Sequence, residues 1–250
     1  MSSADGGRAG APTPPPPSLA VVIPAFDAAA TLPGVLERVR SVVPGAAVVV
    51  VDDGSDDETA CAAAAGGALV VRHPANRGKG RALASGLGAA LAIGAPAVVT
   101  MDADGQHPPE AIPVLVRVLE EGSWDLVVGS RARGPGMPAG RQASNWLSSA
   151  LVSRAVGFRV PDSQSGFRAM RRDVAAAVRP RGERYEFETE FLIVAARLGF
   201  RVGSVAVPTV YDGTPSHFRY GADTLAIASV FLRHWRGVLL GPTGALEARR

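Results

Sequence analysis

The chain contains a single cysteine, Cys61, among its 250 residues. A disulfide framework and a cysteine-based metal site both need several cysteines, so both are excluded. Aromatic residues make up only 6% of the sequence, which leaves few side chains to stack on nucleic-acid bases. The formal net charge is +3 and there is no basic stripe, so we expect no nucleic-acid partner.

Long hydrophobic runs are also missing. The apolar segments fall well short of the roughly 18 residues that a membrane span needs, so we expect no integral membrane protein. The proline-rich opening lacks the apolar stretch of a secretory signal, and we expect residues 1–17 to be a disordered lead. These features predict a cytoplasmic protein, whose mild positive charge suits anionic small molecules or an anionic membrane surface.

The length of 250 residues suits one large domain or two small ones. Along it, short β-branched runs alternate with segments rich in Ala and Leu. Short β-branched runs predict strands at 20–23, 48–51, 69–71, 98–101 and 126–128. Segments rich in Ala and Leu predict helices at 31–43, 57–65, 79–93, 109–121 and 185–198. Alternation with continuously apolar strands predicts an α/β fold, in which a mainly parallel sheet carries helices on both faces.

Polar residues follow four of the five expected strands. They are Asp27, Asp52, Asp53, Asp102, Asp104 and Arg131. Ligands of such sheets bind at the carboxyl ends of the strands, so the acids suggest a divalent cation and a polar ligand there. The alternative is that Asp, Gly and Ser only form turns and helix caps. We favour this alternative for Asp56 and Asp57, because Asp57 is placed to cap the following helix.

The strongest of these signals is Asp102-Ala103-Asp104, with Gln106 two residues further on. In extended geometry the three side chains point the same way and offer the oxygen ligands that Mg²⁺ or Mn²⁺ prefers. A lone Asp-x-Asp is a weak signal, but its place after a central strand strengthens it. We therefore predict a metal site of Asp102, Asp104 and Gln106, and leave out His107, since a histidine in a polar turn more often hydrogen-bonds locally.

Six motifs occur in a fixed order along the chain. They are VVIPAFD (21–27), VVDDGS (50–55), NRGKG (76–80), MDADGQH (101–107), GSR (129–131) and DSQSGFR (162–168). Together they resemble family 2 glycosyltransferases with the GT-A fold, a Rossmann-like architecture. Within that family they most resemble the dolichol-phosphate mannose synthase and polyprenyl-phosphate glucosyltransferase branch. The resemblance covers about residues 19–220 and predicts a catalytic domain at 18–220, followed by a C-terminal amphipathic helix and tail at 221–250.

The resemblance implies a role for individual residues. Pro24, Phe26, Asp27, Asp52 and Asp53 match positions that hold the base and ribose of a nucleotide sugar, and Lys79 borders the same pocket. Asp102, Asp104 and Gln106 match the metal set that grips the donor diphosphate. Arg131, Arg141 and Ser144 match positions that hold an acceptor phosphate, and we assign Gln164 and Arg168 to the same group. We expect Asp102, Asp104 and Arg131 to be catalytic.

Two features leave the donor less defined. The family commonly has an acidic residue after the position of Asp27, whereas this chain continues with Ala28-Ala29-Ala30, so the choice between GDP and UDP stays open. The leaving diphosphate also needs positive charge, for which His217 and Arg219 are candidates. The alternative for these two is a basic surface turn.

The acceptor decides whether the enzyme needs a base. A sugar hydroxyl must lose a proton in the transition state, and Asp162 or Glu188 would have to accept it. A phosphate monoester has a second pKa near about 6 and reacts already deprotonated, so it needs only arginines to position it. The first hypothesis is therefore inverting transfer of a hexose, mannose or glucose, to polyprenyl phosphate; the alternatives are a hydroxyl acceptor and a non-catalytic nucleotide-sugar-binding protein.

The segment 222–240 has apolar residues at helical spacing, Leu225, Leu232 and Trp235 among them, interrupted by Arg233 and His234. Such a helix could lie in the interface of a membrane with its basic residues at anionic headgroups. The alternative is an amphipathic helix docked on the sheet. Because the given sequence has no spanning segment, we expect any membrane contact to be peripheral, at the cytoplasmic face.

Overall fold

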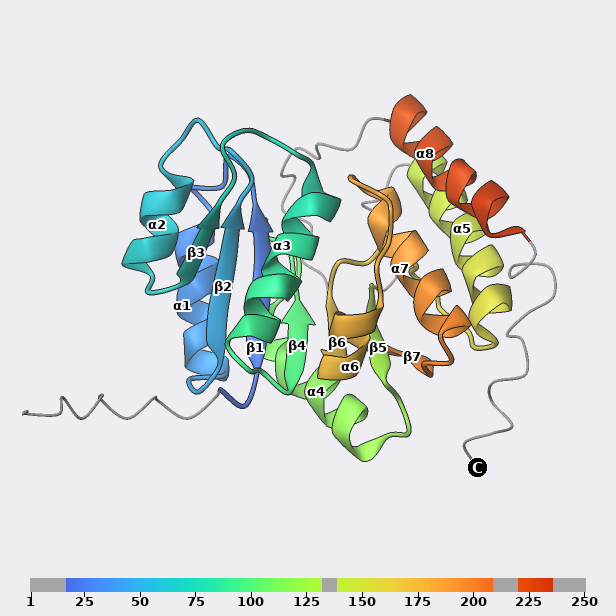
Figure 1. Cartoon of the computed structure of the whole chain (residues 1–250), viewed down its shortest axis with the longest axis horizontal. Helices are drawn as coiled ribbons and strands as arrows, with labels where there is room; N and C mark the ends of the chain where they lie inside the picture. Colours follow the sequence, from blue (N-terminus) through green and yellow to red (C-terminus); the bar gives the residue numbers. More distant parts are fainter. Residues whose placement is uncertain (1–16, 132–138, 209–219, 236–250) are drawn as a thin grey trace, which may run out of the picture.

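The computed structural model describes residues 17–131, 139–208 and 220–235. These ranges contain one seven-stranded sheet with the order β3-β2-β1-β4-β6-β5-β7 (Figure 1). Its strands are β1 (Ala20–Ala25), β2 (Ala47–Asp52), β3 (Leu69–Arg72), β4 (Ala97–Thr100), β5 (Leu126–Arg131), β6 (Arg168–Arg171) and β7 (Val202–Val207). Only β6 runs antiparallel to its neighbours, β4 and β5. The predicted α/β fold with a mainly parallel sheet is confirmed.

Helices cover both faces of this sheet. One face carries α1 (Leu32–Val42), α2 (Thr59–Ala65), the short 3-10 helix η1 (Pro109–Ala111) and α4 (Ile112–Glu121). The other carries α3 (Lys79–Ala92), α5 (Ala139–Val156), α6 (Arg172–Ala177), α7 (Glu186–Arg197) and α8 (Tyr220–Arg233). Since side chains alternate along a strand, Val21 of β1 packs against the first group and Val22 against the second.

The expected strands and helices occur close to their predicted positions. The helix expected at 109–121 is divided, because Pro113 has no N–H to donate to the carbonyl of Pro109, and the first turn is a 3-10 helix. The helices α5 and α6 and the strands β6 and β7 were not expected. The predicted lead at 1–17 lies outside the described residues apart from Pro17, and the predicted domain boundaries stay predictions.

In the part of the chain that the structure describes, the helices are too short or too polar to cross a bilayer.

Two helices, α5 and α8, lie side by side at the edge of the molecule that is opposite to α2 (Figure 1). Both pack against α7.

The strand order places a crevice at one end of the sheet. The chain runs from β1 outward to β2 and β3, and then crosses to β4 on the other side of β1. The loops that follow β1 and β4 therefore diverge, and ligands of open α/β sheets bind at such a switch point.

Candidate active site

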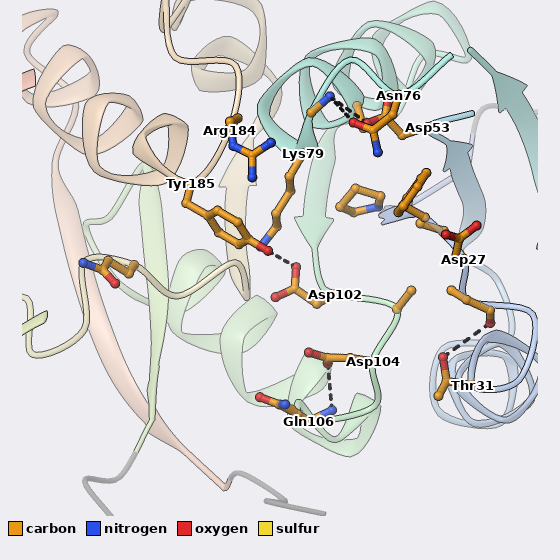
Figure 2. Close-up of a pocket in the computed structure, with 18 of the residues that line it drawn as sticks. Asp27, Thr31, Asp53, Asn76, Lys79, Asp102, Asp104, Gln106, Arg184 and Tyr185 are labelled. Atoms are coloured by element: carbon orange, nitrogen blue, oxygen red, sulfur yellow. Dashed lines mark hydrogen bonds and ion pairs between the residues drawn. The ribbon is translucent and has the colours of Figure 1, made fainter. Parts of the chain in front are cut away.

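A cleft of about 270 Å³ opens at the carboxyl ends of β1, β2 and β4. Ten residues that the sequence predicts for the site line it: Pro24, Phe26, Asp27, Asp53, Lys79, Asp102, Asp104, Gln106, Arg131 and Gln164. Asn76, Arg184 and Tyr185 also line it. Figure 2 shows Asp102, Asp104 and Gln106 following one another along one side of the cleft, with Lys79 and Tyr185 beside Asp102.

A turn arranges the predicted metal residues. β4 ends at Thr100, and Gly105 has a φ of 74°, which glycine adopts without strain. The Asp104 carboxylate accepts the N–H of Gln106 at 3.0 Å. The expected extended geometry is thus wrong, because the strand stops before Asp102 and the turn brings Asp102, Asp104 and Gln106 to one cleft instead.

The donor set fits a hard divalent cation. Burial raises the pKa of Asp104, and the negative charge of Asp102 raises it further, so a cation between them would relieve their repulsion. Gln106 adds an amide oxygen in the same cleft. Within the described ranges, no group of three or more His, Cys, Asp or Glu side chains is placed to hold a metal. Two carboxylates and an amide suit Mg²⁺ or Mn²⁺ that completes its coordination with water and a ligand phosphate.

Lys79 is the first residue of α3 and bridges two acids. Its Nζ lies 2.8 Å from Oδ1 of Asp102 and 2.8 Å from Oε1 of the buried Glu188. Burial works against the charge of Lys79, but these carboxylates outweigh it and raise its pKa. Burial also opposes ionisation of Asp102, yet the charge of Lys79 lowers the pKa of Asp102 below its usual value. Lys79 and Asp102 are therefore held ionised at neutral pH, and the ammonium of Lys79 also contacts the buried carboxylate of Glu188.

Asp53 joins three segments at the top of the cleft. Its carboxylate accepts the N–H of Arg77 at 3.1 Å and the N–H of Gly78 at 2.8 Å. His73 contacts the same carboxylate, with 2.6 Å between Nδ1 and Oδ1, and its Nε2 lies 2.9 Å from Oγ of Ser85. Asp53 is thereby fixed in orientation. His73 follows the edge strand β3, and no sequence signal pointed to it, since its relation to Asp53 arises from the pairing of β3 with β2.

Asp52 is not among the residues that line the cleft, and its predicted contact with the nucleotide stays a prediction. Its Oδ1 accepts the N–H of Ser55 at 2.9 Å, and its Oδ2 lies 3.1 Å from Nε of Arg72. Consecutive residues at the end of a strand point to opposite sides, so only one of Asp52 and Asp53 can face the ligand. Asp52 instead stabilises the turn after β2.

The loop after β1 is held by the loop after β2. Asp27 has a φ of 48°, donates its N–H to Oγ of Ser55 at 3.0 Å and accepts the N–H of Asp56 at 3.1 Å. Asp57 was predicted to cap α2, but the N-cap residue is Glu58; Asp57, one residue earlier, accepts the N–H of Thr59 at 3.0 Å. The two loops thus form one wall of the cleft.

Arg131 ends β5 and reaches the cleft as half of a buried pair. Its Nε and Nη2 lie 2.6 and 3.3 Å from the two carboxylate oxygens of Asp162. The two carboxylates proposed as a base are therefore both ion-paired, Asp162 with Arg131 and Glu188 with Lys79. Neither is among the residues that line the cleft.

Arg168 is buried beneath the loop that it was predicted to share with the acceptor. It donates to the carbonyls of Ser165 at 2.8 Å and Ser163 at 3.1 Å. Burial lowers its pKa to about 10, so it remains protonated at neutral pH. Arg168 supports the loop from behind, while Gln164 of the same loop lines the cleft. The predicted contact of Arg168 with the acceptor phosphate stays a prediction.

Four predicted residues cannot be placed in this way. Arg141 and Ser144 lie on α5, where only the backbone is described, and His217 and Arg219 lie outside the described residues. Conversely, Arg184 and Tyr185 line the cleft although the sequence did not single them out. Their signal was a cationic and an aromatic residue at the start of an expected helix that faces the sheet.

The chain resembles known proteins in both sequence and structure. The sequence profile described as "Glycosyl transferase family 2" matches residues 20–179. An undecaprenyl-phosphate mannosyltransferase of Micrococcus luteus is 34% identical over 202 residues, 76% of this chain and 82% of that protein. A UDP-N-acetylglucosamine–dolichyl-phosphate N-acetylglucosaminyltransferase of Methanococcus voltae is 33% identical over 171 residues, 66% of this chain and 67% of that protein.

Among solved structures, glucosyl-3-phosphoglycerate synthase of Mycobacterium tuberculosis, in complex with Mn²⁺, UDP and glucosyl-3-phosphoglycerate, has a TM-score of 0.70. It is 27% identical, and the match covers 87% of this chain and 79% of that chain. The sheet, the switch-point cleft and its acids define the GT-A class of glycosyltransferases. The chain belongs to glycosyl transferase family 2, and it is a glycosyltransferase. The resemblance stated from the motifs is confirmed.

Proposed function

We propose that this enzyme is metal-dependent and transfers a hexose, mannose or glucose, from GDP- or UDP-sugar to polyprenyl phosphate, with inversion. One observation carries the choice of acceptor. The cationic side chain of Arg131 lines the cleft. The candidate bases for a hydroxyl acceptor, Asp162 and Glu188, do not line it and form buried ion pairs with Arg131 and Lys79. A site with a fixed arginine and without these bases suits an acceptor that arrives deprotonated.

The donor end of the cleft is the side with the acids. Asp102, Asp104 and Gln106 would hold Mg²⁺ or Mn²⁺, which when bound acts as a Lewis acid on the leaving diphosphate. Asp53, together with the wall around Pro24, Phe26 and Asp27, would hold the base and ribose. Lys79 keeps Asp102 ionised and in place, because its ammonium is within 2.8 Å of that carboxylate.

The acceptor end is the side with Arg131. A guanidinium pairs with phosphate oxygens through two parallel N–H groups, and this geometry orients the attacking oxygen. Asp162 holds the guanidinium so that little side-chain freedom is lost when the acceptor binds. The names of the Micrococcus and Methanococcus relatives, which specify undecaprenyl and dolichyl phosphate, support this assignment.

We also propose peripheral contact with the cytoplasmic face of a membrane. Five large apolar side chains, here called the apolar ridge, are each more than half exposed: Trp146 and Leu147 on α5, Leu225 and Leu232 on α8, and Trp235 just after α8. The two helices lie side by side (Figure 1). An apolar ridge of this kind can enter the headgroup region, where a polyprenyl acceptor presents its phosphate.

The reaction is tested with purified protein, a panel of GDP- and UDP-sugars and polyprenyl phosphate, with and without Mn²⁺. We expect a lipid-linked sugar with one donor, and its loss in chelator or in Asp104→Ala. Full turnover of Asp104→Ala in chelator would contradict the metal-dependent mechanism. Transfer to a soluble saccharide, abolished by Asp162→Asn or Glu188→Gln, would favour the hydroxyl acceptor. Donor binding without any product would favour a non-catalytic protein.

Membrane contact is tested by co-sedimentation with vesicles that contain anionic lipid. We expect the double variant Leu225→Ser, Leu232→Ser to remain in the supernatant while the unaltered protein sediments. Leu69→Ser is the matched control, since Leu69 is an exposed leucine on β3, at the other edge of the sheet. Equal sedimentation of all three proteins would contradict the role of the apolar ridge.

A further inference from the structure

One buried carboxylate, Glu190, contacts the residues at the end of α8. Glu190 of α7 is 1% exposed, and its Oε1 lies 3.0 Å from Nε2 of His234 and 3.4 Å from Nη1 of Arg233. Its Oε2 accepts the backbone N–H groups of Arg181 and Gly182, both at 2.8 Å. The two oxygens of Glu190 therefore hold two different parts of the chain.

The hydrogen-bond direction in this cluster is determined by Arg197. Its Nη1 lies 2.8 Å from Nδ1 of His234, and a guanidinium can only donate. Nδ1 of His234 is thus the acceptor, and Nε2 carries the proton that is donated to Glu190. Burial opposes the charge of Glu190, but the hydrogen bonds from His234 and the backbone lower its pKa, so it remains a strong acceptor.

The segment that Oε2 holds, here called the cleft loop (residues 181–185), forms part of the donor site. Its Glu183 carbonyl accepts the N–H of Gly80 at 2.8 Å, directly beside Lys79. Arg184 and Tyr185 line the cleft, and the ring centroid of Tyr185 is 5.7 Å from Nζ of Lys79. A shift of the cleft loop would therefore move the lining of the cleft and the start of α3 together.

Few side chains of α8 are buried against the body of the enzyme. Of its side chains that the structure describes, only Ile227 and Val230 are buried, while Leu225 and Leu232 are 73% and 75% exposed. Arg233 ends the helix, His234 follows it, and both contact Glu190. Whatever displaces or holds α8 thus acts on the carboxylate that holds the cleft loop.

We infer that Glu190 is a positioning residue that couples α8 to the donor cleft: His234 and Arg233 orient its carboxylate, and the carboxylate fixes the cleft loop against Lys79. The inference rests on the proposed function only in taking the cleft as the nucleotide site. It predicts that docking of α8 tightens binding of a nucleoside diphosphate. A membrane that holds α8 through the apolar ridge would then favour the donor-binding form.

The test measures backbone amide exchange by NMR and the affinity for UDP and GDP in Mn²⁺, in the full chain. In His234→Ala we expect the amides of Arg181 and Gly182 to exchange about tenfold faster, and the dissociation constant of the bound nucleotide to rise about tenfold, because a hydrogen bond to a buried charge is lost. The amide of Val22 in β1 should be unaffected. His234→Gln retains a donor and should restore both values, and Ala228→Ser, exposed on α8, is the matched control.

Unchanged exchange at Arg181 and Gly182 in His234→Ala would overturn the inference. So would faster exchange throughout the sheet, since α8 would then contribute only to global stability. If His234→Ala does not fold, Glu190→Gln tests the same coupling, because its amide has one acceptor oxygen in place of two. Amide exchange is measured without sugar donor or acceptor substrate. A failure of the proposed sugar transfer would therefore not affect this test.

Discussion

Two arginine–carboxylate pairs in this enzyme have the same two-point geometry but differ in burial. The side chains of Arg131 and Asp162 are 9% and 3% exposed, whereas those of Arg38 and Glu110 are 42% and 53% exposed. Water screens the exposed pair, while the buried pair is shielded from it. Loss of a partner therefore has different consequences at the two positions.

We expect Asp162→Asn to lower the free energy of unfolding by about 3 kcal/mol, because it leaves a buried guanidinium without its counter-ion. Glu110→Gln should lower it by less than about 1 kcal/mol, since that pair is exposed. Urea denaturation of both variants measures the difference. Similar losses in the two variants would show that Arg131 is not anchored as described. In transfer assays, Asp162→Asn should also raise the KM for polyprenyl phosphate more than that for the donor.

His73 contributes to the cleft through Asp53. We expect His73→Ala to weaken nucleotide binding about tenfold, because a short hydrogen bond to a buried carboxylate is lost. Ser85→Ala should have a smaller effect, since it removes only the contact on the far side of the imidazole. Calorimetric titration with UDP or GDP in Mn²⁺ measures both. An affinity in His73→Ala equal to that of the unaltered protein would mean that the backbone donors alone orient Asp53.

At the scale of elements, the start of α3 and the cleft loop are in direct backbone contact. A Cβ atom at Gly80 would lie 2.8 Å from the carbonyl oxygen of Gly182 and 2.8 Å from the carbonyl carbon of Glu183. At Gly88, on the same helix, nothing lies within 4 Å. The close approach of the cleft loop thus requires glycine at position 80. Nothing in the described structure requires it at position 88.

We expect Gly80→Ala to lower the free energy of unfolding by about 1–3 kcal/mol and to weaken nucleotide binding, because the cleft loop must move. Gly88→Ala should raise the free energy of unfolding by about 0.5–1 kcal/mol, since alanine favours the helix. Thermal unfolding, with and without nucleotide, measures both effects. A stabilising Gly80→Ala would show that the loop tolerates the added methyl group.

At the scale of the whole molecule, the stability of the fold depends on pH through His107, a histidine next to the predicted metal residues. His107 is buried, and its ring centroid lies 5.2 Å from that of Phe167. In the described part of the chain its Nδ1 has no hydrogen-bond partner. Burial lowers the pKa of His107 from an ordinary 6.5 to about 4. The unfolded chain therefore binds more protons than the folded one between these values.

The sign follows from that difference. We expect the contribution of neutral His107 to stability to be complete above pH 6.5 and to be lost as the pH falls toward 4, at about 1.4 kcal/mol per pH unit. Urea denaturation in chelator at several pH values measures it, and His107→Leu should remove this part of the pH dependence. Identical pH profiles of the two proteins would show that the pKa of His107 is the same in the folded and unfolded states.

The sequence by itself determined the class of fold and most of the cleft. Apolar runs and helical segments are local signals, so the strands around β1 and the helices between them were predictable. The acids after three of the expected strands were predictable as neighbours, because parallel strands end at one edge of a sheet. Ten of the predicted residues do line the cleft.

Only the tertiary structure decided which partner each charged side chain contacts. Asp52 and Asp53 are adjacent in sequence, but strand geometry turns one to the cleft and the other to Arg72. Arg168 was predicted to contact a phosphate, but burial directs it to carbonyl groups. The pairs of Lys79 with Glu188 and of Glu190 with His234 join segments far apart in the chain. No local pattern encodes such pairs, because their partners meet only when the sheet and its outer helices have packed.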